Sequence, residues 1–185
     1  MQLLIKKIIS CVIALVTVVG MNISAKAAST EVNVTWTQVH IVYAGPTVPS
    51  IHSQMNDSSN VIAYLNNVDT IYVMANTGQI DWLRCKYNGQ VGFIRTQWIG
   101  FTTNTFYKTY FNGKVLKRGF TGQAVWNLQL LMKKKCGYTT LGYDGIFGSE
   151  TEKKVIEYQK IKGLTQDGMV GKNTAGKILD DFEEP

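Results

Sequence analysis

The chain has 185 residues, of which 45% are hydrophobic and 17% are charged, and its formal net charge is +6. This composition is typical of a globular protein and excludes a disordered one. Three of the 19 basic residues lie within residues 1–27, so the remainder carries 16 basic and 13 acidic residues, a net charge of +3. A charge this small does not indicate a nucleic-acid partner.

Residues 1–27 have the three parts of a secretory signal peptide. Lys6 and Lys7 are followed by an almost wholly apolar run from Ile8 to Met21, and Ala25-Lys26-Ala27 forms an A-x-A cleavage site. The run is short for a membrane span, although an uncleaved anchor is the alternative. We therefore expect a secreted protein, extracellular or associated with the cell wall, with no membrane contact after cleavage.

Residues 32–101 show short alternating runs of apolar residues separated by turn signals. The runs include NVIAYL, TIYVMA, DWLRCKY and VGFIRTQWI. Short alternating runs separated by turn signals predict a small all-β barrel. The clearest hairpin is at Asn88-Gly89, because Asn-Gly supplies the positive φ angles of a type I′ turn.

These runs resemble the bacterial SH3-like domain of cell-wall proteins. The resemblance extends over the order of the motifs: a Gly-Pro turn, a Val-Ile-x-x-Leu strand, a Trp that opens a strand, and an Asn-Gly hairpin followed by Gly-aromatic. It implies an SH3-like barrel over residues 32–101. The loop from Thr47 to Asn60 is expected to be longer than usual for the family. Residues 102–114 then read as a partly ordered connector with a small hairpin at Asn112-Gly113.

From residue 115 the apolar residues recur at the spacing of an α-helix. Thr121 is expected to cap a helix that Cys136-Gly137 ends. Ser149-Glu150-Thr151-Glu152 reads as a capping box that opens a second helix, and a third, shorter helix holds Thr174 and Ile178. The stretches DGIFGSET and DGMVGKNT begin with the same Asp-Gly turn. We expect the chain to use one turn-and-helix unit twice, at Asp144 and at Asp167.

This segment resembles the three-helix peptidoglycan-binding domain of cell-wall hydrolases. The match covers LKRGFTGQAVWNLQLLMKK and the long stretch from YDGIFGSET to DGMVGKNT. It implies an all-α three-helix domain over residues 115–182 that binds peptidoglycan. The family often has Trp where this chain has Ala175. The predicted fold class is therefore two small domains, an all-β SH3-like barrel followed by an all-α peptidoglycan-binding-like domain.

The candidate catalytic groups favour a protein that is not an enzyme. Cys85 and Cys136 are far apart in the sequence without a C-x-x-C motif, and His40 and His52 lie in the first third of the mature chain. Free cysteines are usually buried, so we expect neither a Cys–His nucleophile nor a disulfide between them. Four ligands in close pairs are absent from the sequence, so no metal or cofactor is expected. Paired carboxylates were the other catalytic option, but turn and helix-start roles account for the candidate acids.

Two binding functions stay open. The first is a non-catalytic peptidoglycan-binding protein that recognises glycan or stem peptide. The second is a wall-anchored adaptor whose SH3-like domain binds a protein or peptide partner, or a targeting subunit of a cell-wall hydrolase. Because such ligands need flat aromatic rings and convergent polar groups, the candidate ligand-binding residues are Tyr43, Trp82, Trp98, Tyr138, Tyr143, Asp144, Thr151 and Asp167.

Overall fold

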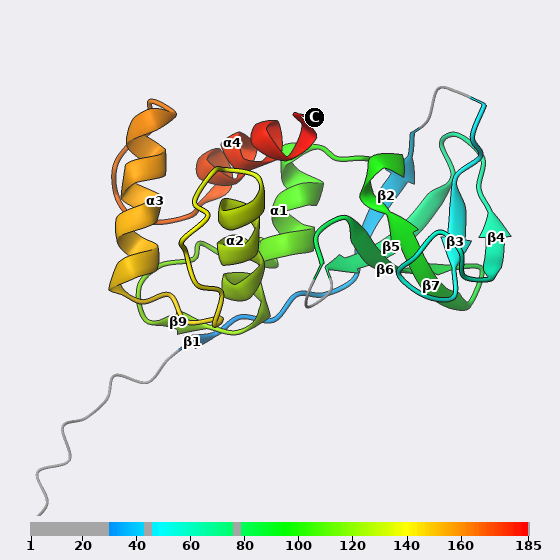
Figure 1. Cartoon of the computed structure of the whole chain (residues 1–185), viewed down its shortest axis with the longest axis horizontal. Helices are drawn as coiled ribbons and strands as arrows, with labels where there is room; N and C mark the ends of the chain where they lie inside the picture. Colours follow the sequence, from blue (N-terminus) through cyan, green and yellow to red (C-terminus); the bar gives the residue numbers. More distant parts are fainter. Residues whose placement is uncertain (1–29, 43–45, 76–78, 185) are drawn as a thin grey trace, which may run out of the picture.

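The computed structural model describes residues 30–42, 46–75 and 79–184, and the predicted signal peptide and Tyr43 lie outside them. Within these residues the chain forms a β-rich part and a helical part, with helix α1 (Thr103–Phe111) between them (Figure 1). The β-rich part comes first in the sequence and the helical part second, in the predicted order.

The described strands of the β-rich part form one antiparallel sheet in the order β4-β3-β7-β6-β5-β2-β8. Their bounds are β2 Thr37–Ile41, β3 Ser50–His52, β4 Val61–Tyr64, β5 Thr70–Ala75, β6 Trp82–Tyr87, β7 Gln90–Arg95 and β8 Ile99–Gly100, with a 3₁₀ turn at Thr96–Trp98. Among the described residues β4 and β8 are the two edges of this sheet. Most of the strands fall within the predicted runs, but β3 lies inside the expected loop Thr47–Asn60, so that expectation is wrong. The described strands leave two edges and do not form the closed barrel expected of an SH3-like domain.

Alternation along the strands explains which face of the sheet is buried. In β2 and β5 the buried side chains alternate with exposed ones, as half-buried strands require. The predicted hairpin between β6 and β7 is confirmed, because Asn88 and Gly89 have φ angles of 47° and 80°. Gly92 in β7 lets strand β3 approach, since a Cβ there would lie 2.5 Å from Ile51 Cγ2.

The predicted connector at residues 102–114 is a helix, and the expected hairpin at Asn112-Gly113 is wrong. Thr102 and Thr105 form a reciprocal capping box at the start of α1, and Asn112 ends it in the left-handed conformation. The helical spacing of its apolar residues explains the difference. Its buried side chains are Phe106, Tyr107, Thr109, Tyr110 and Phe111.

The remaining helices are α2 (Gln123–Lys134), α3 (Ser149–Ile161) and α4 (Lys172–Glu183). Helix α1 packs against both α4 and α2. All three helices expected from the sequence are present, but two expected caps are wrong. Thr121 lies in strand β9 (Phe120–Thr121), and α2 begins after Gly122. The capping box at Ser149 does not form, because Ser149 is already the first residue of α3 and Gly148 is at the cap position.

The start of the described chain lies against the helical part, before the chain enters the sheet. Strand β1 (Thr30–Glu31) pairs in parallel with β9 (Figure 1). The next residue, Val32, is buried, and its carbonyl accepts from Ala124 N–H at 2.9 Å. The buried apolar residues of both parts belong to one continuous core. The chain therefore joins the sheet to the helices twice, once before β2 and once through α1.

Candidate functional site

A buried glutamine organises the first Asp-Gly turn. Gln129 lies on α2, and its Nε2 donates to Asp144 Oδ1 at 2.9 Å, to the Ile146 carbonyl at 3.1 Å and to Thr151 Oγ1 at 3.1 Å. Its Oε1 accepts from Gly145 N–H at 2.8 Å. Asp144 Oδ1 also accepts from Ile146 N–H at 2.9 Å, so the carboxylate closes its own turn as predicted.

The second Asp-Gly turn repeats this network atom for atom. Gln159 on α3 donates to Asp167 Oδ1 at 2.8 Å, to the Met169 carbonyl at 2.8 Å and to Thr174 Oγ1 at 3.2 Å. Its Oε1 accepts from Gly168 N–H at 2.9 Å. In each copy a helix supplies the glutamine, and the turn leads into the next helix. The repeated motif is therefore a repeated hydrogen-bonded unit.

These bonds also set the electrostatics of the first turn. The hydrogen bond from Gln129, together with the Ile146 N–H, lowers the pKa of Asp144 below its ordinary value. The carboxylate thus stays ionised at neutral pH, held by donors that belong to the fold. Its first role is structural, which leaves Asp144 poorly suited to proton transfer.

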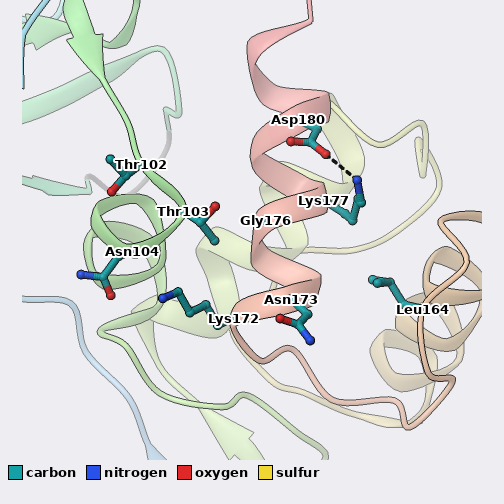
Figure 2. A pocket seen from close by; sticks show the side chains of 9 residues that line it. All are labelled: Thr102, Thr103, Asn104, Leu164, Lys172, Asn173, Gly176, Lys177 and Asp180. Atoms are coloured by element: carbon teal, nitrogen blue, oxygen red, sulfur yellow. Dashed lines mark hydrogen bonds and ion pairs between the residues drawn. The ribbon is translucent and has the colours of Figure 1, made fainter.

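A groove lies between the start of α1 and the exposed face of α4 (Figure 2). Its volume is about 790 Å³, and Thr102, Thr103 and Asn104 form one wall. Helix α4 forms the other wall with Lys172, Asn173, Gly176, Lys177 and Asp180, and Leu164 lies at one end.

Gly176 brings the two helices of this groove close together. A Cβ at Gly176 would lie 3.2 Å from Thr103 Cγ2, which is tighter than ordinary van der Waals contact. The Lys177 ammonium binds the Asp180 carboxylate at 2.9 Å, whereas Lys172, the first residue of α4, forms no ion pair within the described chain. The groove therefore presents hydroxyl and amide groups and one unneutralised cation.

A second hollow, of about 530 Å³, adjoins the groove along the second Asp-Gly turn. It shares Leu164, Lys172 and Asn173 with the groove, and its other lining residues include Asp167 and Thr174. The second copy of the turn thus borders an open surface. Neutral hydrogen-bonding groups with lysine ammonium groups suit a ligand rich in hydroxyl, amide and carboxylate groups.

The candidate residues chosen from the sequence fall in several separate places. Trp82 is buried, with the His52 ring edge-on at 5.4 Å and the Arg95 guanidinium 4.6 Å from the ring centroid. Trp98 is half-buried against the core. Thr151 is buried, and its Oγ1 accepts a hydrogen bond from Gln129. These three side chains belong to the packing of the protein.

The two tyrosine candidates in the helical part, Tyr138 and Tyr143, follow α2 in the sequence and differ in exposure. Tyr138 is buried, and burial raises the pKa of its hydroxyl to about 12. Tyr143 is 45% exposed, with the Trp126 ring edge-on at 5.6 Å and the Lys133 ammonium 5.3 Å from its ring centroid. Tyr143 and Asp144 therefore remain close to each other, whereas Asp167 borders the α1–α4 groove.

The sequence reasoning missed the groove residues because it read α1 as a connector. Thr103 and Asn104 belong to that helix, and Lys172 and Asn173 lie in the first turn of α4. The aromatic spacing in TFYKTYF was the signal that could have found α1. Among the described residues no cluster of His, Cys, Asp or Glu has the arrangement of a metal site. None of the described helices is long and apolar enough to cross a membrane.

One family model matches a segment of the helical part. Residues 121–178 match the model of a family described as "Putative peptidoglycan binding domain". The chain is also similar to a solved peptidoglycan-binding protein from Clostridioides difficile in complex with glutamine hydroxamate, at 26% identity and a TM-score of 0.35, covering 66% of each chain. A periplasmic domain of the EpsAB fusion protein of the Vibrio vulnificus type II secretion system shares 11% identity and a TM-score of 0.31, over 78% of this chain and 63% of that one.

Both TM-scores are below 0.5, so these two likenesses say nothing about the arrangement of this chain. The family match concerns residues 121–178 alone. The matched residues include Gln129 and Gln159 and both of the turns that they close. The segment that forms both Asp-Gly turns is therefore the one that matches the model of the peptidoglycan binding domain family.

Proposed function

We propose that this protein is exported and binds peptidoglycan through its helical part without catalysing a reaction on it. The observation that carries the proposal is the family match over residues 121–178, the segment that supplies the second Asp-Gly turn and the first part of α4. The α1–α4 groove is the ligand site in this proposal. Its amides, hydroxyls and unpaired Lys172 suit the acetamido, hydroxyl and carboxylate groups of the wall polymer.

The state of the nucleophilic and acidic groups supports a non-catalytic role. Burial raises the pKa of the Cys85 thiol to about 12, and burial with the nearby Asp181 raises that of Cys136 to about 12. A thiol with such a pKa is not a thiolate at neutral pH, and the thiolate is the nucleophile. The carboxylates of Asp144 and Asp167 are bonded within their own turns.

Export and an SH3-like sheet are the two further parts of the proposal. The n-region, apolar run and A-x-A site of residues 1–27 support export. The antiparallel sheet and its Asn-Gly hairpin are compatible with an SH3-like domain. N-terminal sequencing of the exported protein tests the first part, since a mature chain that begins near Ala28 is expected and one that retains Met1 contradicts it.

Sedimentation with purified peptidoglycan sacculi tests the binding function. The mature protein should sediment with sacculi and should release neither reducing ends nor free amines from them. Gly176→Leu would fill the groove and Lys172→Ala would remove its unpaired cation, so both should lower the bound fraction.

Two variants outside the groove serve as controls. Gly142→Leu places the same side chain in a loop where a Cβ has no neighbour within 4 Å, and Lys153→Ala removes an exposed cation from α3. Both should bind as the unmodified protein does. A folded, unmodified protein that stays in the supernatant overturns the proposed function.

A further inference from the structure

The outer face of the sheet carries an aromatic and polar surface that the family match does not reach. Tyr72 on β5 lies between Gln38 on β2 and Lys86 on β6 in the cross-strand register. All three side chains are exposed, as is that of Trp36 just before β2. The exposed fractions are 46% for Tyr72 and 39% for Trp36. This surface is well suited to contact a flat ligand.

Trp36 and Tyr72 stand between two hollows. The first, of about 340 Å³, extends from these rings to the β6–β7 hairpin and includes Thr70 and Lys86. The second, of about 470 Å³, extends from the same rings to α1 and includes Gln38 and Lys108. Because both hollows are lined by Trp36 and Tyr72, one bound chain can contact both rings and enter both hollows.

The hollow beside α1 adjoins the α1–α4 groove across a shared residue. Asn104 lines both the hollow beside α1 and the groove, and Lys172 lines both the groove and the hollow at the second Asp-Gly turn. Four adjoining hollows therefore lead from the β6–β7 hairpin to Asp167. We call this path the track.

Specific contacts hold the two halves of the track together. Thr35 Oγ1 donates to Asn112 Oδ1 at 3.0 Å, which attaches the segment that holds Trp36 to the end of α1. The Arg84 guanidinium lies over the Trp36 ring, 5.8 Å from its centroid, in a cation–π contact. Such contacts lower the entropy that binding costs, because the surface is ordered before the ligand arrives.

The chemistry of the track fits a polysaccharide of N-acetylated sugars with acidic groups attached along it. The C–H faces of a sugar ring are apolar and contact flat aromatic rings, whereas its hydroxyl and acetamido groups need hydrogen-bond partners. Threonine, asparagine and glutamine side chains supply those partners. A lysine lines every hollow: Lys86, Lys108 and, in the groove and the last hollow, Lys172. These charges favour a polymer that carries acidic groups along its length, as the stem peptides attached to the glycan strand of peptidoglycan do.

We infer that the track binds the glycan strand of peptidoglycan along its length, with Trp36 and Tyr72 stacking on its sugars. This inference rests on the proposed function and names the part of the wall that is recognised. It predicts that affinity increases with the length of the sugar chain, because a dimer reaches one hollow and a longer oligomer reaches several.

The test uses the mature full-length protein and oligomers of N-acetylglucosamine with two and six sugars, measured by titration calorimetry. The hexamer should bind at least tenfold more tightly than the dimer. Trp36→Ala and Tyr72→Ala should each weaken hexamer binding by about tenfold, the effect expected for a lost aromatic contact. Tyr64→Ala is the matched control, because Tyr64 is 68% exposed on β4 and does not line the track.

The inference is overturned if Trp36→Ala and Tyr72→Ala, both with the circular dichroism of the folded protein, bind the hexamer as tightly as the control. It is also overturned if sacculi stripped of their stem peptides no longer bind the unmodified protein, since recognition would then belong to the peptide. If either of these results is found but the unmodified protein still sediments with intact sacculi, the proposed function is retained and only this inference is wrong. Protein that does not sediment at all contradicts the proposed function itself.

Discussion

The side-chain amide of Gln159 donates to the carboxylate of Asp167 over 2.8 Å, and Gln129 makes the same bond to Asp144 over 2.9 Å. Each glutamine also accepts from the glycine N–H that follows the aspartate. Gly148 and Gly171 precede the helices after these turns, at the cap position, and have no side chain to cap them. The glutamine and the aspartate therefore order the chain where a capping residue would otherwise act.

Replacing either glutamine with leucine should destabilise the helical part. Gln129→Leu and Gln159→Leu leave a buried glycine N–H without its acceptor and remove three donated bonds, so we expect a loss of at least about 1–3 kcal/mol in the free energy of unfolding. Urea denaturation followed by circular dichroism measures it. Gln166→Leu is the control, because Gln166 is exposed beside the second turn. Equal midpoints for all three variants would contradict the role assigned to the network.

The glycines of the two turns should resist substitution. Gly145 and Gly168 have φ angles of 75° and 69°, a conformation that costs a β-branched residue on the order of 1 kcal/mol or more. Gly145→Val and Gly168→Val should therefore lower the melting temperature. Gly142→Val is the comparison, since Gly142 has no positive φ and no neighbour near a Cβ. Melting temperatures that match this comparison would rule out the strained turn.

Local patterns predicted most of the fold. The Asn88-Gly89 hairpin and the two Asp-Gly turns follow from positive φ angles that few residues tolerate, so these short motifs were sufficient. Long-range pairing was not predictable in this way. Strand β1 is two residues long, and its partner β9 lies far along the chain, so neither has a periodicity that identifies it. Helix α1 was not predicted, because residues 102–114 were interpreted from the sequence as a partly ordered connector.

The candidate site was harder to predict than the fold. Asp144 and Asp167 could be read as turn residues from their spacing, and the structure confirms that role. The two glutamines could not be recognised as partners of those turns, because each lies on the preceding helix and their bonds depend on how the helices pack. Aromatic residues were poor guides for the same reason. Trp82 is buried, whereas Trp36, which was not selected, is exposed.

Helix α1 should make the sheet and the helices unfold together. Phe106 is fully buried among the rings of Phe101, Tyr110, Phe111 and Phe182. Phe106→Ala should lower the free energy of unfolding by about 3–5 kcal/mol, the usual cost of such a cavity. Midpoints from far-ultraviolet circular dichroism and from tryptophan fluorescence should shift together. Tyr64→Ala, at an exposed site, should change stability little. Two separate transitions would show that the continuous core does not couple the parts.

Cys85 and Cys136 should remain reduced thiols that react only when the protein unfolds. Both are free in the structure; Cys85 is fully buried in the sheet, and Cys136 is half-buried after α2. Iodoacetamide at pH 8 should modify neither in the native protein and both in urea. A linked Cys85–Cys136 peptide in non-reduced mass spectrometry would contradict this prediction.

The same burial predicts how stability changes in alkali. The pKa of each thiol is raised from 9.0 to about 12 in the folded protein. Below pH 9 both thiols are protonated whether the chain is folded or unfolded, so their contribution to stability is fully present. Between pH 9 and 12 the unfolded chain loses thiol protons that the folded chain keeps, so the free energy of unfolding should fall as pH rises. The double variant Cys85→Ala/Cys136→Ala should lose less stability between pH 8 and 10 than the unmodified protein, as measured by urea midpoints. Equal losses would mean that the thiols ionise as readily in the folded state as in the unfolded one.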